Sequence, residues 1–171
     1  SHPRRTPEMS LLHRFRHPGY SEAKRRALLV AARERVSPAI RDLDTEFCFN
    51  IEVAGDLPGR ADEVLTWLLA ETFEPEGFGG RSSLGADGLV LEVGPRMSFT
   101  TAWSTNAVSV CHACGLTEVQ RIERSRRYRL VVDGKLSDAE VDAFLHLVHD
   151  RMTECRYRKP LESFATGVHP E

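Results

Sequence analysis

The sequence has no long hydrophobic run. None of its stretches approaches the roughly 18 to 20 consecutive apolar residues that a membrane-spanning helix requires. The N-terminal residues SHPRRTPEM also lack the apolar core of a secretory signal peptide. These absences predict a protein with no membrane partner, and a cytoplasmic location is the default expectation.

The chain also lacks a large excess of positive or negative charge. The chain has 23 Lys and Arg against 25 Asp and Glu, for a net charge of -2, so it exerts no overall attraction on nucleic acid or acidic surfaces. We expect no nucleic-acid partner. The 41% hydrophobic and 28% charged residues are typical of a soluble globular protein. A length of 171 residues suits one domain, or two small halves that share a core.

Cysteine is scarce, and no second pair accompanies the C-x2-C spacing of Cys111 and Cys114. A structural zinc site needs four ligands, usually from two such pairs, so Cys48, Cys155 and His149 would have to converge on the first pair. Cys111 and Cys114 end an apolar helical stretch, where free cysteine behaves as a small hydrophobe. We therefore expect reduced thiols in the core and no metal site.

Catalytic motifs are also missing. A thiol nucleophile needs a lowered pKa and an oriented base. The two cysteines lie near the C-terminal end of the expected helix, where the helix dipole disfavours a thiolate. His112 is next to Cys111 in sequence, but successive helical residues face different directions, so it is not placed as their base. The chain contains no paired carboxylates, no HExxH and no GxSxG. The sequence therefore predicts no catalytic residue.

The patterns that are present indicate an α+β domain. Apolar periodicity and turn signals predict strands at 11–17, 47–53, 89–93 and 118–132, and helices at 21–36, 60–72, 104–114 and 137–154. A glycine-rich loop, EPEGFGGRSSLGADG, separates the two halves of this series.

The two halves repeat each other at an offset of 79 residues. Leu11 and Leu12 meet Val90 and Leu91, and the glycine after the central strand recurs as Gly55 and Gly134. Chance likeness between βαβα patterns is the alternative, and the shared glycine inside a matching apolar frame disfavours it. We therefore expect a tandem, pseudo-twofold duplication of a βαβα unit, like an isologous dimer fused into one chain. Further matched pairs are Ile40 with Val119, Leu43 with Ile122, Phe49 with Tyr128, Ile51 with Leu130, Val53 with Val132 and Leu65 with Phe144.

The same pattern sets the expected domain limits. The duplicated domain covers 9–155, with repeats at about 9–76 and 88–155. Residues 1–8 are expected to be a flexible arm or the remnant of a purification tag. Residues 156–171 have no sustained period and contain two prolines, and we expect them to begin a linker to further domains.

Two polar segments could bind a partner. PRMSFTTAWSTN, at 95–106, places Arg96 and several hydroxyl groups before a helix, where they could receive an anion. The alternative is that Thr101 or Ser104 caps the helix while Trp103 packs its first turn onto the core. The cluster RIERSRRYR, at 121–129, could follow a nucleic-acid backbone, but its acidic neighbours and alternating apolar residues favour an exposed or protein-binding strand face.

Several strings resemble the N-terminal domain of phosphoribosylformylglycinamidine synthase, the large single-chain amidotransferase family. The resemblance covers about Met9 to Phe164, in the order and spacing of the family. The strings are TEFCFNIE at 45–52, VLEVGPR at 90–96, STNAVSVCHACGL at 104–116, VQRIERSRRYRL at 119–130 and LVHDRMTE at 147–154.

The resemblance implies a parent enzyme of purine biosynthesis, a glutamine-hydrolysing, ATP-dependent C–N ligase that converts formylglycinamide ribonucleotide to its amidine. It implies ATP and Mg²⁺ in the parent, no cofactor in this piece, and a fold similar to a dimer of the small subunit of the multi-subunit enzyme. The synthetase and glutaminase domains lie downstream in that family, so no family catalytic residue matches this chain, which alone should be inactive.

The partners implied are the synthetase and glutaminase domains of the same polypeptide. The polar loop and the arginine-rich strand suggest a role in organising their contact and the transfer of ammonia. Alternatives are a free-standing regulatory or binding module and a noncatalytic viral homologue. The candidate interface residues are Arg96, Trp103, Ser104, Arg121 and Arg124.

Overall fold

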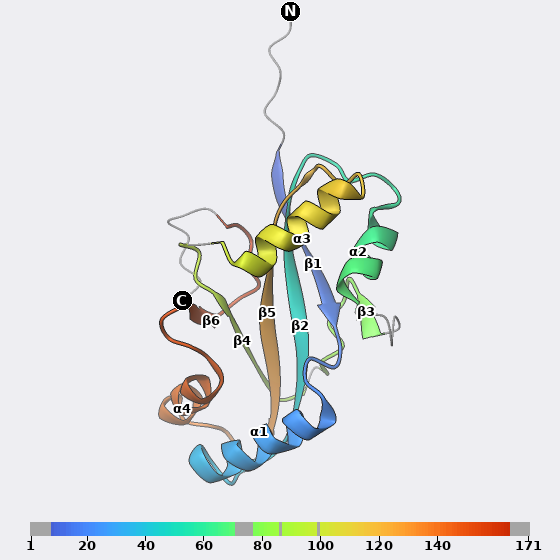
Figure 1. The fold of residues 1–171 in the computed structure, drawn as a ribbon. Coiled ribbons are helices and arrows are strands. Elements are labelled where there is room, and N and C mark those ends of the chain that lie inside the picture. Colours follow the sequence, from blue (N-terminus) through green and yellow to red (C-terminus); the bar gives the residue numbers. More distant parts are fainter. Residues whose placement is uncertain (1–7, 71–76, 86, 99, 165–171) are drawn as a thin grey trace, which may run out of the picture.

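A computed structural model describes residues 8–70, 77–85, 87–98 and 100–164. The described chain is an α+β domain in which one antiparallel sheet has six strands in the order β3-β1-β2-β5-β4-β6 (Figure 1). The strands are β1 (Met9–Arg16), β2 (Ile40–Ala54), β3 (Phe78–Gly79), β4 (Leu89–Pro95), β5 (Val119–Val132) and β6 (Glu154–Tyr157). The helices are α1 (Glu22–Arg35), α2 (Ala61–Leu69), α3 (Ala102–Ala113) and α4 (Asp138–Val148).

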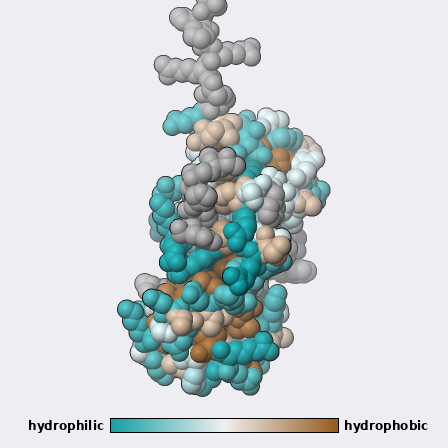
Figure 2. Space-filling view, turned by 90° about the vertical axis from the view of Figure 1, so that its left-hand side faces the viewer, coloured by the Kyte–Doolittle hydropathy of each residue, from teal (hydrophilic) through white to brown (hydrophobic). Residues whose placement is uncertain are grey.

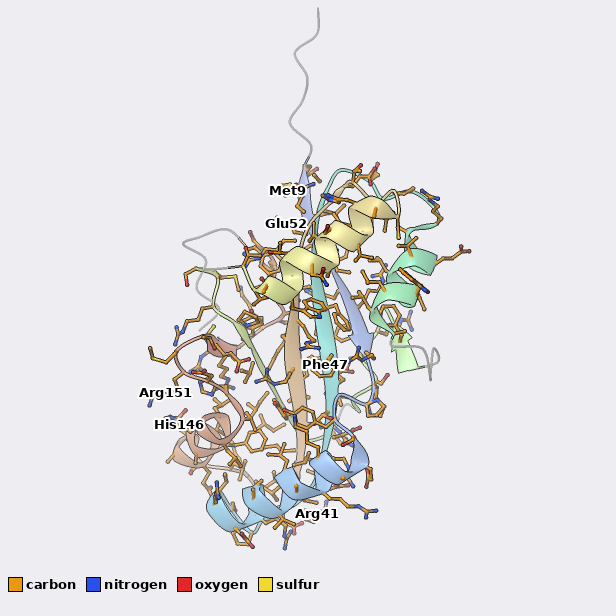
Figure 3. The ribbon with its side chains drawn as sticks, in the orientation of Figure 1. Met9, Arg41, Phe47, Glu52, His146 and Arg151 are labelled. Carbon is orange, nitrogen blue, oxygen red and sulfur yellow. The ribbon has the colours of Figure 1, made fainter. Side chains whose placement is uncertain are left out.

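The helices form two pairs at opposite ends of the sheet. Helices α2 and α3 lie at one end and contact each other, and α1 and α4 do so at the other (Figure 1). Both pairs cover the same face, because the core residues beneath them are alternate residues of β2 and β5. The centre of this face lies between the pairs, where Figure 3 shows Phe47.

Each helix pair closes its own hydrophobic cluster. The first cluster joins β2 and β5 to α2 and α3, with Phe49 and Leu65 completely or almost completely buried. The second joins β2, β4 and β5 to α1 and α4, with Tyr128 and Phe144 completely buried. Both of these clusters therefore contain one helix from each half of the chain.

The long pairing of β2 with β5 has a symmetric register. Leu43 lies opposite Leu130 and Ile51 lies opposite Ile122, and the Phe47–Arg126 pair is midway between them. Leu43 and Ile122 are 79 residues apart, and so are Ile51 and Leu130, so the repeat relates the first of these pairs to the second. Gly55 and Gly134, which follow the two strands, have nearly equal φ angles of 81° and 82°.

The outer strands do not keep the offset of 79. Leu12 pairs with Ile51, and Leu89 pairs with Leu130, so Leu12 corresponds to Leu89 and not to Leu91. The expected match of Leu11 and Leu12 with Val90 and Leu91 was thus wrong by two residues. A shift of two keeps the same side chains on the same face, so the apolar pattern is insensitive to it.

Strand β3 lies inside the expected glycine-rich loop, and two predicted elements have clearly different bounds. Strand β2 begins at Ile40 and not near 47, because Leu43 and Thr45 point inward between exposed or half-buried acidic residues. Helix α4 ends at Val148 and not near 154, and β6 follows it and pairs with β4.

The expected start of a linker at 156 therefore lies inside a strand. Cys155 and Tyr157 of β6 form a third cluster with Leu161 and Phe164. A strand of four residues is too short to show a period in sequence, which is why this segment looked irregular. The expected arm at 1–7, the end of the helix predicted to reach 72, and residues beyond 164 lie outside the described part of the chain.

Among the described residues, no helix combines the length and the apolar character that crossing a membrane would take.

Candidate functional site

The cysteines belong to the hydrophobic interior. Cys111 is completely buried on α3, and Cys114 is half-buried at the end of that helix. Burial, aided by Cys114, raises the pKa of Cys111 to about 11, and burial also raises the pKa of Cys48. In the described ranges no group of three or more His, Cys, Asp or Glu side chains is placed to hold a metal ion. The interpretation of Cys111 as a core thiol is confirmed.

This arrangement predicts a distinct order of thiol reactivity. In the native chain at pH 8, a disulfide reagent should react first with Cys114, while Cys48, Cys111 and Cys155 react only at the rate of unfolding. Colorimetric counting of thiols with and without denaturant measures this, and Cys114→Ser should remove the fast phase. A fast phase that persists in that variant would contradict the prediction.

A groove crosses the middle of the helix-bearing face, between the two helix pairs. Two neighbouring cavities, of about 430 and 170 Å³, share Arg124 and Arg126 as lining residues. We call this the central groove. Its aromatic and basic lining residues are Tyr20, Lys24, Phe47, Trp103, Arg124 and Arg126, and Glu123 and Glu154 line it as well.

Cationic groups stack on aromatic rings in this groove. The Arg124 guanidinium carbon lies 4.8 Å from the centroid of the Phe47 ring and 5.3 Å from that of Trp103. Arg16 covers Phe47 from another side, at 4.7 Å, and Lys24 lies 4.1 Å above Tyr20. Such contacts hold the cationic groups in place against the aromatic rings.

Arg126 forms the fixed side of the groove. Its guanidinium donates to both carboxylate oxygens of Glu154, at 2.7 and 3.0 Å, to the carbonyl of Val148 and to the hydroxyl of Tyr128. Burial alone would lower the pKa of Arg126, but the hydrogen bonds and charge of Glu154 raise it overall, so the group stays cationic. The ion pair ties β6 to β5.

Trp103 and Arg124 are the two predicted interface residues that the structure brings together in the groove. The Trp103 ring also stacks on Phe49, with centroids 5.9 Å apart. Arg96 lies at the end of β4, where its guanidinium donates to the carbonyl of Arg151. It therefore holds the α4–β6 connection in place.

The other two predicted interface residues lie elsewhere. Ser104 is completely buried, and its hydroxyl accepts a hydrogen bond from the backbone of Ile122, so it fixes α3 to β5 and has no surface to offer. Arg121 is on the opposite face of β5 from Arg124, because they are three residues apart on a strand. Its guanidinium covers the Phe164 ring at 4.4 Å.

The start of α3 already holds an anion, supplied by the chain. The Glu123 carboxylate accepts from the Thr101 backbone and hydroxyl at 3.1 and 2.7 Å, and Arg121 pairs with it at 3.1 Å. The Thr101 hydroxyl in turn accepts from the Ser104 backbone. The capping interpretation of this segment is therefore confirmed, and the hydroxyl group that caps the helix is that of Thr101.

Sequence reasoning missed the groove residues Arg16, Tyr20, Phe47 and Arg126. These come from three strands and one loop, so no local motif joins them. The repeat offset of 79 links Phe47 to Arg126 as it links every matched pair, and only the register of β2 with β5 places these two opposite each other.

The chain matches one enzyme family over most of its length. The family described as Formylglycinamide ribonucleotide amidotransferase N-terminal matches residues 46–164. Phosphoribosylformylglycinamidine synthase of Dictyostelium discoideum is 40% identical over 172 residues, and that of Homo sapiens is 41% identical over 139. These alignments cover 95% and 78% of this chain.

A plant relative is equally informative. The probable phosphoribosylformylglycinamidine synthase of Arabidopsis thaliana is 47% identical over 171 residues, covering 96% of this chain. The name of that protein carries the words chloroplastic/mitochondrial, so the cytoplasmic location expected for this chain stays a prediction. The chain spans only 10 to 13% of the length of these three relatives. By the extent of these matches, the chain belongs to the family of formylglycinamide ribonucleotide amidotransferase N-terminal domains.

Proposed function

We propose that this chain is the non-catalytic N-terminal domain of a phosphoribosylformylglycinamidine synthase, which uses glutamine and ATP to convert formylglycinamide ribonucleotide to its amidine in purine biosynthesis. The similarity to named synthases over most of the chain supports this assignment. In such a parent the reaction, with its ATP and Mg²⁺, belongs to the downstream synthetase and glutaminase domains. We place no cofactor site of that reaction and no catalytic residue among the described residues of this chain.

We also propose that the domain arose as a tandem duplication, equivalent to two small subunits fused into one chain. The symmetric register of β2 with β5 about Phe47 and Arg126 supports this. So does the exchange of helices, since each hydrophobic cluster takes one helix from each half. A twofold-symmetric interface has such reciprocal contacts, because an element of one partner meets in the other what the same element of the other meets in the first.

The central groove is the surface that we assign to docking with the downstream domains. Its accessible groups combine aromatic rings with arginine, which is the composition found at the centre of protein interfaces. A surface that presents carboxylates and an apolar side chain would complement it. Docking there would hold synthetase and glutaminase together and keep ammonia from escaping to water.

The single observation that carries this role is the stacking of Arg124 between Phe47 and Trp103. In the full-length enzyme, Arg124→Ala should raise the glutamine hydrolysed per amidine formed by about twofold to tenfold, because a weakened contact between domains costs on the order of 1 kcal/mol or more. Turnover with added ammonium should change little. Parallel assays of glutamate and amidine formation measure both.

Arg41→Ala is the matched control, since Arg41 is an exposed arginine in an ion pair at the end of β2, far from the groove along the strand. It should leave the ratio unchanged. If Arg124→Ala and Arg96→Ala both left the ratio and glutamine-dependent turnover as in the unsubstituted enzyme, the docking role would be excluded.

A further inference from the structure

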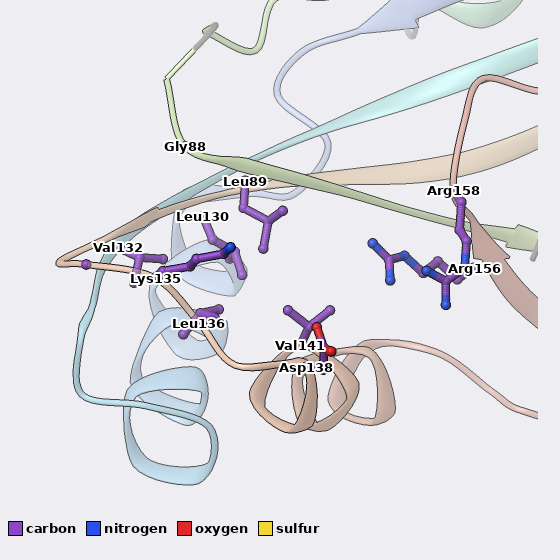
Figure 4. Close-up of a pocket in the computed structure, with 11 residues that line it drawn as sticks. Gly88, Leu89, Leu130, Val132, Lys135, Leu136, Asp138, Val141, Arg156 and Arg158 are labelled. Atoms are coloured by element: carbon purple, nitrogen blue, oxygen red, sulfur yellow. The ribbon is translucent and has the colours of Figure 1, made fainter.

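A second cavity lies at the end of the sheet that carries α4, outside the central groove. It measures about 370 Å³ and opens between β4, β5, the start of α4 and the residues of β6 (Figure 4). Its inner surface is aliphatic. The side chains that form this surface are Leu89, Leu130, Val132, Leu136 and Val141.

The rim of this cavity is predominantly cationic. Lys135 extends over it from one side, and Arg156 and Arg158 face it from the other (Figure 4). Asp138 is the acidic side chain that lines it. Seen from the side of α4 and β6, apolar surface gathers in the lower half of the molecule and is bordered by polar residues (Figure 2).

Arg156 is poorly neutralised there. Its Nε atom is buried and, within the described ranges, has no hydrogen-bond partner. Burial and the nearby Arg158 lower the pKa of Arg156, while Asp142 and Asp138 act weakly in the opposite direction. A nearby anion would stabilise the charge of this guanidinium, because burial and Arg158 both disfavour it.

The opposite edge of the sheet shows why this cavity exists. There the short strand β3 pairs with β1, and its residue Phe78 packs against the first hydrophobic cluster. At the other edge β6 pairs with β4, and Arg156 lies opposite the completely buried Val93 on the same face as the second cluster. An arginine thus stands where the other edge has a phenylalanine, and the aliphatic surface beneath it is left open.

We propose that this cavity binds a small amphipathic organic anion. A phosphate or carboxylate group would be held by Arg156 and Arg158, and an apolar or heterocyclic body would cover Leu89, Leu130 and Val141. Arginine is suited to both head groups, because its planar donors match two oxygens at once. The volume lies at the lower end of the range of about 300–1,000 Å³ that is usual for small-molecule sites.

Binding to the 171-residue chain can be measured by calorimetry with four probes. Adenosine monophosphate and 4-phenylbutyrate test a phosphate and a carboxylate on an apolar body, and inorganic phosphate and adenosine test the head and body alone. We expect at least one of the first two probes to bind about tenfold or more tightly than either half-probe, as expected when both parts contribute. Which of the two binds identifies the head group.

Two variants locate the site. Arg156→Phe should fill the cavity in the way that Phe78 does at the other edge, and Arg158→Ala removes only an exposed cation. Each should weaken binding by about tenfold or more, the loss usual for one charge-assisted contact. Lys159→Ala, an exposed lysine of the same segment that does not line the cavity, should leave the affinity within about twofold, as a surface charge in high dielectric contributes little.

Three results would overturn the proposal. The first is that neither amphipathic probe binds better than inorganic phosphate or adenosine. The second is that Arg158→Ala leaves binding unchanged, which is informative even if Arg156→Phe does not fold. The third is an equal loss in Lys159→Ala, since that would show attraction by general positive charge and not a site.

Discussion

Replacement of Arg127 by methionine is expected to lower the free energy of unfolding by about 3–5 kcal/mol, the usual cost of breaking a buried ion pair from one side. The Arg127 guanidinium donates to the Glu46 carboxylate at 2.7 Å, and Glu46 is completely buried. The Nε atom of Arg127 also lies 3.4 Å from the buried carboxylate of Glu92. Without the arginine, two neighbouring carboxylates would share a dry environment with no cation between them.

Hydroxyl and backbone groups that donate hydrogen bonds to the two carboxylates reduce this loss of stability but do not cancel it. Ser82 and Ser83 donate to Glu46, and Ser125 donates to Glu92. Burial already raises the pKa of Glu92, so its charged form is disfavoured even with Arg127 present. Urea unfolding at pH 7 measures the effect.

An exposed pair of the same chemistry provides the control. Arg41 and Asp133 are 2.8 Å apart and more than half exposed, at 59% and 68%, and Arg41→Met should cost only about 0–1 kcal/mol. The double variant Glu46→Gln with Arg127→Met should recover part of the loss, because no unpaired charge remains at Glu46. Equal losses for Arg127→Met and Arg41→Met would contradict the account of a buried network.

Truncation of Phe49 to alanine is expected to cost about 3–5 kcal/mol, as for a large aromatic side chain in a well-packed core. Phe49 is 1% exposed, and its ring centroid lies within 5.9 to 6.5 Å of those of Phe47, Phe78 and Trp103. The change would leave a cavity beneath Trp103. Arg124 packs on Trp103, so the central groove should become less ordered in addition to the loss of stability.

Trp67→Ala is the matched control for this prediction. The Trp67 side chain is as large, but it is 65% exposed on α2, and its truncation should change the free energy of unfolding by only about 0.5 kcal/mol or less. The emission of Trp103, followed in a Trp67→Phe background, reports the groove separately. An unaltered Trp103 emission in Phe49→Ala would show that the groove does not depend on this stacking.

Periodicity was sufficient where a residue pattern is long. The helix at 21–36 and the strand at 118–132 were predicted to within two residues of α1 and β5, because each has at least three turns or seven alternations to display its period. The pattern failed at β6, which has four residues, and at the start of β2, where acidic residues interrupt the apolar alternation. Short or interrupted elements depend on their neighbours for definition.

The candidate site shows the same division. Trp103 and Arg124 could be named from composition, since aromatic residues and arginine are common at interfaces. Ser104 was misplaced because a hydroxyl near a helix start serves equally well as a surface donor or a buried bond to the next strand, and only its contact with Ile122 distinguishes them. The sequence did not separate Arg121 from Arg124, because the face of β5 that meets the helices is set by pairing with β2, and an interface role for Arg121 stays a prediction.

The local pattern of residues was thus enough for the α+β class, the order of the main elements, the buried state of Cys111 and the resemblance to one enzyme family. These properties depend on residue propensity, periodicity and short motifs along a continuous stretch of sequence. The central groove, the anion that Glu123 supplies to α3 and the cavity under Arg156 required the folded chain. Each joins segments tens of residues apart, and whether a side chain meets a partner across that separation is settled by strand register and packing, which no single stretch encodes.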